Sequence, residues 1–311
     1  MTNLTHYYAY FEQGDDYQET LWLLTLLSFE MLLVILNVGS ILVILTSPIL
    51  RCTPKYVLAI NLSIVFLVQA LLLLSVWIAA RFYSQIQIDF CTLYYYQFLV
   101  GILCVALIGT FCAAMNIVYV IRIKSPNSFD SNKQYFVLAI FIILAYFVNG
   151  VTVTPIYNKF VDRVEYIMDS QSVCGYKILN ARREIILLVL ANVPHYCFVI
   201  LAGCLILILY YRYKNCRRIS KPYDLVVTNI VVLILCFIPV LIKLWCLSHL
   251  RMNAMCKDEG IWQRVQSVAP LTVGILVPFI WFLNPVYRHA VRDFITCKCC
   301  KASLTNSYEL V

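Results

Sequence analysis

The chain has 311 residues, of which 62% are hydrophobic and 13% are charged. A soluble domain has roughly 45–50% apolar and about 25% charged residues, so a water-soluble globular fold is excluded and the surrounding solvent must be largely lipid. The net charge of +8 does not indicate a nucleic-acid partner, because the basic residues lie in short loops between apolar runs, as membrane topology requires.

Seven stretches of the sequence are long and apolar enough to cross a lipid bilayer, since a transmembrane helix needs about 20 mainly apolar residues. In chain order they are Leu21–Thr46, Tyr56–Ala80, Cys91–Val120, Tyr135–Val153, Ile185–Tyr211, Leu225–Leu247 and Val265–Tyr287. The sequence therefore predicts an all-α membrane protein whose seven-transmembrane helix bundle occupies residues 21–287. An N-terminal tail, residues 1–20, precedes the bundle, and residues 288–311 follow it.

The distribution of charge predicts which end of the bundle faces the cytoplasm. If the N-terminus is outside, the cytoplasmic segments hold 14 basic and 4 acidic residues, and the outer segments hold 9 basic and 11 acidic residues. Cytoplasmic loops are enriched in Lys and Arg. We therefore expect a multi-pass protein of the plasma membrane with its N-terminus outside and its C-terminus in the cytoplasm.

Two short motifs in the tails agree with this orientation. Asn3-Leu4-Thr5 is a glycosylation sequon in the N-terminal tail. Cys297, Cys299 and Cys300 stand beside basic residues just past the last span, a pattern typical of palmitoylation at the cytoplasmic face.

Ionisable side chains are rare within the predicted spans, and in membrane proteins such residues mark functional sites. Glu30 in the first span and Lys243 in the sixth lie well inside, and His195 lies in the fifth. Three interpretations of Glu30 stay open: an ion pair with Lys243, a contact with a ligand cavity, or a side chain that reaches the lipid interface. The sequence has no His, Asp, Glu or Cys constellation typical of a metal site or catalytic centre, so we expect no enzyme activity, metal or cofactor.

Six of the spans carry short motifs built from Asn, Cys or Pro. They are Asn37-Val38-Gly39-Ser40 in the first span, Asn61-Leu62-Ser63 in the second, Cys91 at the start of the third, Pro194 in the fifth, Cys236-Phe237-Ile238-Pro239 in the sixth and Asn284-Pro285-Val286-Tyr287 in the seventh. In this order they resemble the motifs of the rhodopsin-like G-protein-coupled receptors. Arg288–Phe294 resembles that family's membrane-surface helix, and the stretch from Thr53 to Gln69 looks most like the atypical odorant receptors of fish.

The resemblance implies a receptor that binds an extracellular small-molecule ligand among the outer halves of its helices and signals through a heterotrimeric G protein. It implies a disulfide between Cys91 and Cys174; a second bridge between Cys246 and Cys256 stays open. The ligand contacts we expect are Glu30, Phe98, Gly101, His195, Phe237 and Lys243. The G-protein contacts we expect are Arg122, Lys124, Arg212, Lys214, Arg217 and Arg218. Proline interrupts helical hydrogen bonding, so we expect bends at Pro194, Pro239 and Pro285.

The chain departs from the family at two functional positions. Phe66 replaces the aspartate of the family's sodium site. The Asp-Arg-Tyr motif at the end of the third span is absent, and the two alignments of that span give Val118-Tyr119-Val120 or Asn116 in its place. The usual arginine contact with a G protein is therefore missing.

Two other functions fit a chain of this composition. One is a receptor for a peptide or a small transmitter. The other, from a different class, is a channel or transporter with seven spans. Transporters and pumps carry several charges or broken helices near the bilayer midplane, so the low polar content of these spans favours a receptor.

Overall fold

The computed structural model describes residues 16–82, 90–124, 136–151, 181–213, 222–242 and 259–296, and every regular element in these ranges is a helix. The all-α class is therefore confirmed for the described part of the chain. In order, the elements are α2 (Asp16–Thr46), α3 (Pro48–Arg51), α4 (Pro54–Phe82), α5 (Phe90–Lys124), an unlabelled helix (Phe136–Val151), α7 (Ala181–Tyr213), α8 (Tyr223–Val232), the π-helical turn η2 (Leu233–Phe237), α10 (Glu259–Trp281) and α11 (Pro285–Ile295).

Five helical segments are long and apolar enough to cross a membrane. They are Leu24–Thr46, Pro54–Leu72, Leu103–Ile121, Val193–Tyr211 and Tyr223–Ile242. A sixth results if the bent pair Val268–Trp281 and Pro285–Ile295 counts as one broken span, and Phe136–Val151 is a shorter apolar helix. The described part thus has the helices of a membrane protein with five or six candidate spans, and the count of seven stays a prediction.

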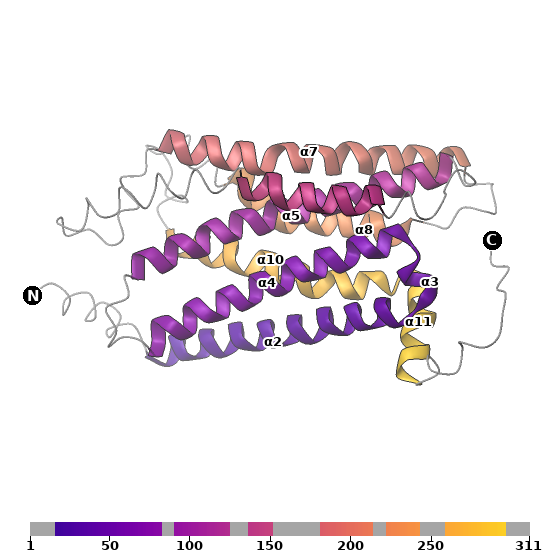
Figure 1. Cartoon of the computed structure of the whole chain (residues 1–311). Coiled ribbons are helices and arrows are strands. Elements are labelled where there is room, and N and C mark those ends of the chain that lie inside the picture. Colours follow the sequence, from indigo (N-terminus) through magenta and orange to yellow (C-terminus); the bar gives the residue numbers. More distant parts are fainter. Residues whose placement is uncertain are drawn as a thin grey trace, which may run out of the picture.

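The long helices lie side by side along one direction (Figure 1). At one end of this bundle, α3 connects α2 to α4, so that these two helices run antiparallel (Figure 1). The short helix α11 leaves the bundle at the same end, with its axis turned by 91° from the segment Val268–Trp281. We call this the α11 end of the bundle.

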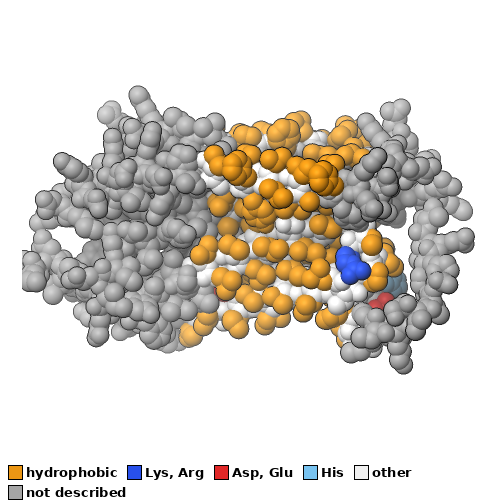
Figure 2. All heavy atoms as spheres, viewed as in Figure 1, with side chains coloured by type: hydrophobic (Ala, Val, Ile, Leu, Met, Phe, Trp, Pro, Cys, Tyr) orange, Lys and Arg blue, Asp and Glu red, His pale blue; other side chains and the backbone are white. Residues whose placement is uncertain are grey.

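The outside of the described bundle is covered by apolar side chains. Figure 2 shows hydrophobic atoms across the whole width of the described face, with Lys, Arg, Asp and Glu atoms close to the α11 end. Ile35, Phe147 and Leu201 are each more than 60% exposed. Water-soluble proteins rarely expose contiguous apolar patches above a few hundred Å², so this surface is suited to lipid.

The inside of the bundle is organised around α5. Of the residues in its candidate span, 78% are buried, against 28 to 50% in the other four spans. In α2 the buried positions recur every three or four residues, at Leu26, Glu30, Leu33, Asn37 and Ser40. This is the period of a helix that turns one stripe toward a core. Because three of these five side chains are polar, the stripe carries hydrogen-bonding groups into the bundle.

The seventh apolar stretch ends earlier than predicted. We expected a span as far as Tyr287, but α10 ends at Trp281, and Tyr287 belongs to α11. The N–H groups of Phe282, Leu283 and Asn284 donate to carbonyls three residues back, which tightens the last turn, and Pro285 has no N–H with which to continue the helix. The surface helix predicted at Arg288–Phe294 accordingly begins at Pro285 and ends at Ile295.

The other prolines lie within helices. Pro194 is inside α7, and α10 contains Pro270 and Pro278, which the sequence analysis did not single out. Pro239 follows the turn η2, in which the N–H of Ile238 donates to the carbonyl of Leu233, five residues back. A single π-helical turn of this kind often marks a functional site within an α-helix.

Candidate functional site: polar contacts inside the bundle

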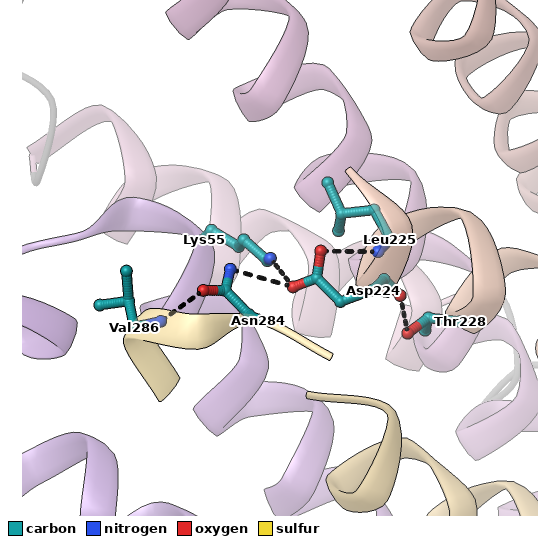
Figure 3. A network of polar contacts seen from close by, with 6 residues as sticks. All are labelled: Lys55, Asp224, Leu225, Thr228, Asn284 and Val286. Atoms are coloured by element: carbon teal, nitrogen blue, oxygen red, sulfur yellow. Dashed lines mark hydrogen bonds and ion pairs between the residues drawn. The ribbon is translucent and has the colours of Figure 1, made fainter. Parts of the chain in front are cut away.

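A group of connected polar side chains lies at the α11 end and is centred on Asp224 (Figure 3). Its carboxylate oxygen Oδ2 forms an ion pair with the ammonium group of Lys55 and accepts a hydrogen bond of 3.4 Å from the side-chain amide of Asn284. The other oxygen, Oδ1, accepts from the backbone N–H of Leu225 at 3.0 Å. The Asp224 side chain is 3% exposed and that of Lys55 is 12% exposed, so this is a nearly dry ion pair.

Local sequence places each of these groups. Asp224 lies in the first turn of α8, where a negative charge is favoured by the helix dipole. Lys55 lies in the first turn of α4, where a positive charge is disfavoured, and Asp224 offsets that cost. Asn284 caps α11: its Oδ1 accepts from the N–H of Val286 at 3.0 Å, and Pro285 occupies the first helical position, where its missing N–H costs nothing.

The Asp224 cluster therefore joins three places that are far apart in sequence: the start of α4, the start of α8 and the corner between α10 and α11. An outward movement of α8 at this end would break the contacts to Lys55 and Asn284. Removing one partner of a buried ion pair costs about 3–5 kcal/mol, because the other charge stays buried. The cluster is therefore a strong constraint on where α8 begins.

Tyr287 fixes α11 to the bundle beside this cluster. Its hydroxyl donates to Ser40 Oγ at 3.1 Å, and its ring stacks on Tyr56 with ring centroids 6.2 Å apart. Trp281 and Phe282 meet the same ring edge-on at 5.9 and 5.4 Å. The sequence predicted the Asn-Pro-Val-Tyr motif inside one continuous helix, whereas it lies at the break between α10 and α11, where it caps and anchors α11.

A second polar contact joins α5 to α8 deeper in the bundle. The side-chain amides of Asn116 and Asn229 hydrogen bond to each other in both directions, at 3.0 and 3.1 Å, and both residues are buried. Asn116 is one of the two positions that the sequence analysis aligned with the missing arginine. In this chain the position makes a contact with the segment predicted as span six.

Two of the predicted ligand residues, His195 and Phe237, lie where α7 meets α5 and η2. Thr110 Oγ1 lies 3.1 Å from His195 Nδ1, and the hydroxyl of Tyr196 donates to the carbonyl of Val105 at 3.1 Å. The ring of Tyr196 stacks on Phe237 with centroids 4.7 Å apart. The π-helical turn η2 of the sixth predicted span is therefore in direct contact with α7.

The approach of α7 to α5 depends on Gly109. A Cβ atom at this position would lie 3.1 Å from the Cβ of His195 and 3.6 Å from the Tyr196 ring. Such a spacing is tighter than ordinary packing allows, so the side chains of α7 would have to move. Small residues at helix interfaces are the usual way in which membrane helices approach closely.

The predicted ligand residue Glu30 is buried. Its side chain is 3% exposed, so the interpretation in which Glu30 reaches the lipid interface is wrong. Its oxygen Oε1 has no hydrogen-bond partner among the described residues. Lys243, the proposed ion-pair partner, lies outside the described residues. The ion pair between Glu30 and Lys243 therefore stays a prediction.

The remaining predicted residues are placed to different extents. Gly101 is a partly buried residue of α5, and a Cβ built on it would meet no atom within 4 Å. Cys91, Phe98, Arg122 and Lys124 belong to α5 and Arg212 to α7 by their backbone, but their side chains are not described. Outside the described residues lie Asn3, Cys174, Lys214, Arg217, Arg218, Lys243, Cys246, Cys256, Cys297, Cys299 and Cys300.

Two comparisons of the chain with known proteins were without a match. No protein-family model matches it, and no curated protein matches it. The geometry of the bundle is therefore the basis for a functional proposal.

Proposed function

We propose that the chain is a cell-surface G-protein-coupled receptor with seven spans, chemosensory and similar to odorant receptors, that binds an extracellular small molecule in the outer half of its bundle. The observation that carries the proposal is the Asp224 cluster. It closes the α11 end of the bundle through the first turn of α8, and a receptor of this kind needs such a contact to hold one of two packings. By the positive-inside rule this end faces the cytoplasm.

The segment α8–η2 has the features of a movable element. The ion pair to Lys55 fixes its start, and the amide pair Asn116–Asn229 fixes its middle. The π-helical turn η2 separates these two contacts from the rest of the segment. A ligand that binds the packing with the α11 end open would shift the population toward that packing. The basic residues Arg122, Lys124, Arg212, Lys214, Arg217 and Arg218 would then meet the G protein.

The proposal is tested by second-messenger output in cells that express the full chain. Asp224→Asn removes the charge that binds Lys55, and we expect higher signalling without ligand than in the unchanged chain at equal surface expression. Asp293→Asn is the matched control, because Asp293 is an exposed acid of α11 without an ion pair to any described residue. Equal signalling from both variants and the unchanged chain would contradict the proposal.

The recognition surface has its own test. Arginine makes bidentate contacts with carboxylates, so Arg122→Gln should abolish ligand-driven signalling and leave surface expression intact. A normal response would show that these basic residues serve only membrane topology. An ionic conductance without a second-messenger response would instead favour a channel.

Orientation is measured separately. One epitope tag is placed at each terminus. In intact cells, an antibody should reach the N-terminal tag and not the C-terminal tag. Accessibility of both tags would exclude an odd number of spans.

A further inference from the structure

Four buried polar atoms on α2 and α4 have no hydrogen-bond partner among the described residues. Three are amide or carboxylate oxygens, Glu30 Oε1, Asn37 Oδ1 and Gln69 Oε1, and one is the hydroxyl of Ser63. All four residues are less than 5% exposed. Burying a polar group without a partner is costly, and for a carboxylate in a membrane interior the cost is larger still. An unpartnered group of this kind therefore indicates a missing donor.

Glu30 and Gln69 lie in one layer of the bundle. The position of a Cβ on Gly274 of α10 is 2.8 Å from Leu33 and 3.0 Å from Phe66, so these two side chains meet at one level. Glu30 is three residues before Leu33 in α2, and Gln69 is three residues after Phe66 in α4. Because α2 and α4 run antiparallel (Figure 1), both steps lead away from the α11 end, by about 4.5 Å.

The floor of this layer is closed by close packing. Asn37 donates to the carbonyl of Gly274 at 2.9 Å and to that of Leu33 at 2.9 Å, which fixes α2 against α10. Leu33 and Phe66 are fully buried apolar side chains at this contact. A molecule in the layer would therefore meet apolar groups on the side of the α11 end and oxygen acceptors from Glu30 and Gln69.

The chemistry of the layer selects the kind of group that would complete it. The unpartnered atoms of Glu30 and Gln69 are both oxygen acceptors, and one belongs to a carboxylate. An ammonium group carries a positive charge and three N–H donors, and a charge-assisted hydrogen bond to a carboxylate is stronger than a neutral one.

We propose that Glu30 and Gln69 bind the ammonium group of a small extracellular amine between α2 and α4. This rests on the proposed receptor function and names the ligand class of its site. The ligand charge compensates Glu30, the amide oxygen of Gln69 takes a second N–H, and the apolar remainder of the amine contacts neighbouring side chains.

The test uses the purified full chain in lipid nanodiscs and its midpoint of thermal unfolding. The probes are the primary alkylammonium chlorides from methyl to hexyl, each against the alcohol of the same chain length, and sodium chloride. A ligand that binds the folded state alone raises the midpoint increasingly with its concentration. We expect at least one amine to raise the midpoint more than its matched alcohol does, and more than sodium chloride does at equal concentration.

Variants of the chain locate the effect. Glu30→Gln should abolish the amine shift, Gln69→Leu should reduce it, and Asp293→Asn, which changes an exposed acid at the far end, should keep it. Without amine, Glu30→Gln should unfold at a higher temperature than the unchanged chain, because it removes a buried charge that has no described partner.

Three results would overturn the proposal. They are an amine shift that survives in Glu30→Gln, a series in which no amine exceeds its alcohol or sodium chloride, and a lower midpoint for Glu30→Gln without ligand, which would reveal an internal ion pair. None of these measurements needs a G protein. A chain that signals to other odorants but binds no amine would therefore support the proposed function and exclude this site. A chain that binds amines through Glu30 but gives no second-messenger response would support the site and exclude the proposed function.

Discussion

Two polar regions of the same bundle differ in how well their donors and acceptors are matched. At the α11 end, both carboxylate oxygens of Asp224 have partners, supplied by Lys55, Asn284 and the backbone of Leu225. In the layer of Glu30 and Gln69, the carboxylate oxygen Oε1 of Glu30 and the amide oxygen Oε1 of Gln69 have no described donor. Asp224 is as deeply buried as Glu30 and Gln69, so the burial of the acceptors does not separate the two regions.

The difference suggests different tasks for the two regions. A matched polar cluster stabilises one arrangement of helices, because every alternative arrangement leaves a charge or an amide unpaired. An unmatched cluster costs free energy in the empty protein and recovers it when a donor arrives. The first region has the properties of a constraint on helix positions, and the second those of a binding site.

The largest effect should come from removing one charge of the matched region. Lys55→Met leaves Asp224 buried without its cation, and we expect the free energy of unfolding to fall by about 3–5 kcal/mol, measured by unfolding in mixed detergent micelles. Arg51→Met is the control, since Arg51 is exposed at the end of α3, and it should change stability by less than about 0.5 kcal/mol. The double variant Lys55→Met, Asp224→Leu should lose less than Lys55→Met alone. A larger loss of unfolding free energy in the double variant would mean that the attraction within the ion pair, rather than the cost of an unpaired buried charge, accounts for the effect of Lys55→Met.

Gly274, which forms the boundary between the two regions, should come next. In Gly274→Ala the new methyl group would lie 2.8 Å from Leu33 and 3.0 Å from Phe66, and overpacking of this kind costs about 1–3 kcal/mol. Gly39→Ala is the matched control, because Gly39 lies in α2 with no atom within 4 Å of its Cβ position, and it should stabilise the helix by about 0.5–1 kcal/mol. Equal effects of the two substitutions would show that α2 and α10 do not pack at Gly274 as described.

The amide pair of α5 and α8 should contribute less. Asn229→Leu leaves the buried amide of Asn116 without its partner, and the expected loss is about 1–2 kcal/mol. Adding Asn116→Leu should restore part of that loss, because no amide is then left unpaired. The same unfolding experiment measures both variants, and additive losses would contradict a direct pair.

The smallest effect should come from the hydroxyl of Tyr287. Tyr287→Phe removes the hydrogen bond to Ser40 and keeps the stack on Tyr56, so the expected loss is about 0.6 kcal/mol. Ser40→Ala should cost a similar amount, and the two substitutions together should cost no more than either alone. A double variant with twice the loss would show that the two groups have separate partners.

The helical elements were predictable from the sequence because an apolar run of sufficient length is a local property. α2, α4, α5 and α7 each contain the apolar stretch predicted for them. The Asn-Pro motif was expected inside one continuous helix, but it lies at the break between α10 and α11. Asn followed by Pro fits a kink inside a helix and the cap of a new helix equally well, and only the hydrogen bond from Val286 to Asn284 decides between them.

The matched polar region was missed, although its residues were noticed. Lys55 and Asp224 were counted as cytoplasmic charges that set the orientation, and nothing local indicates that residues 169 positions apart form an ion pair. One signal pointed toward it: Asp224 is an acid among many basic residues. Asn229, a polar residue inside an apolar run, pointed in the same way to the separate pair with Asn116. Glu30 was singled out correctly as an unusual residue, and its burial removed one of three interpretations.

The turn η2 has a consequence for how the sixth apolar segment can change in length. In an α-helix each residue advances the side chains by about 100° around the axis, so one residue more or fewer rotates everything beyond it by that angle. The π-helical hydrogen bond from Ile238 to Leu233 accommodates one extra residue within a single turn. Deleting Leu235 would therefore return the turn to α-helical geometry and leave Pro239 and the residues after it on the face that they occupy now. The buried face that begins at Asp224 and Thr228 would also keep its register. This turn is thus a place where the segment can lose one residue without rotating its far half against its near half.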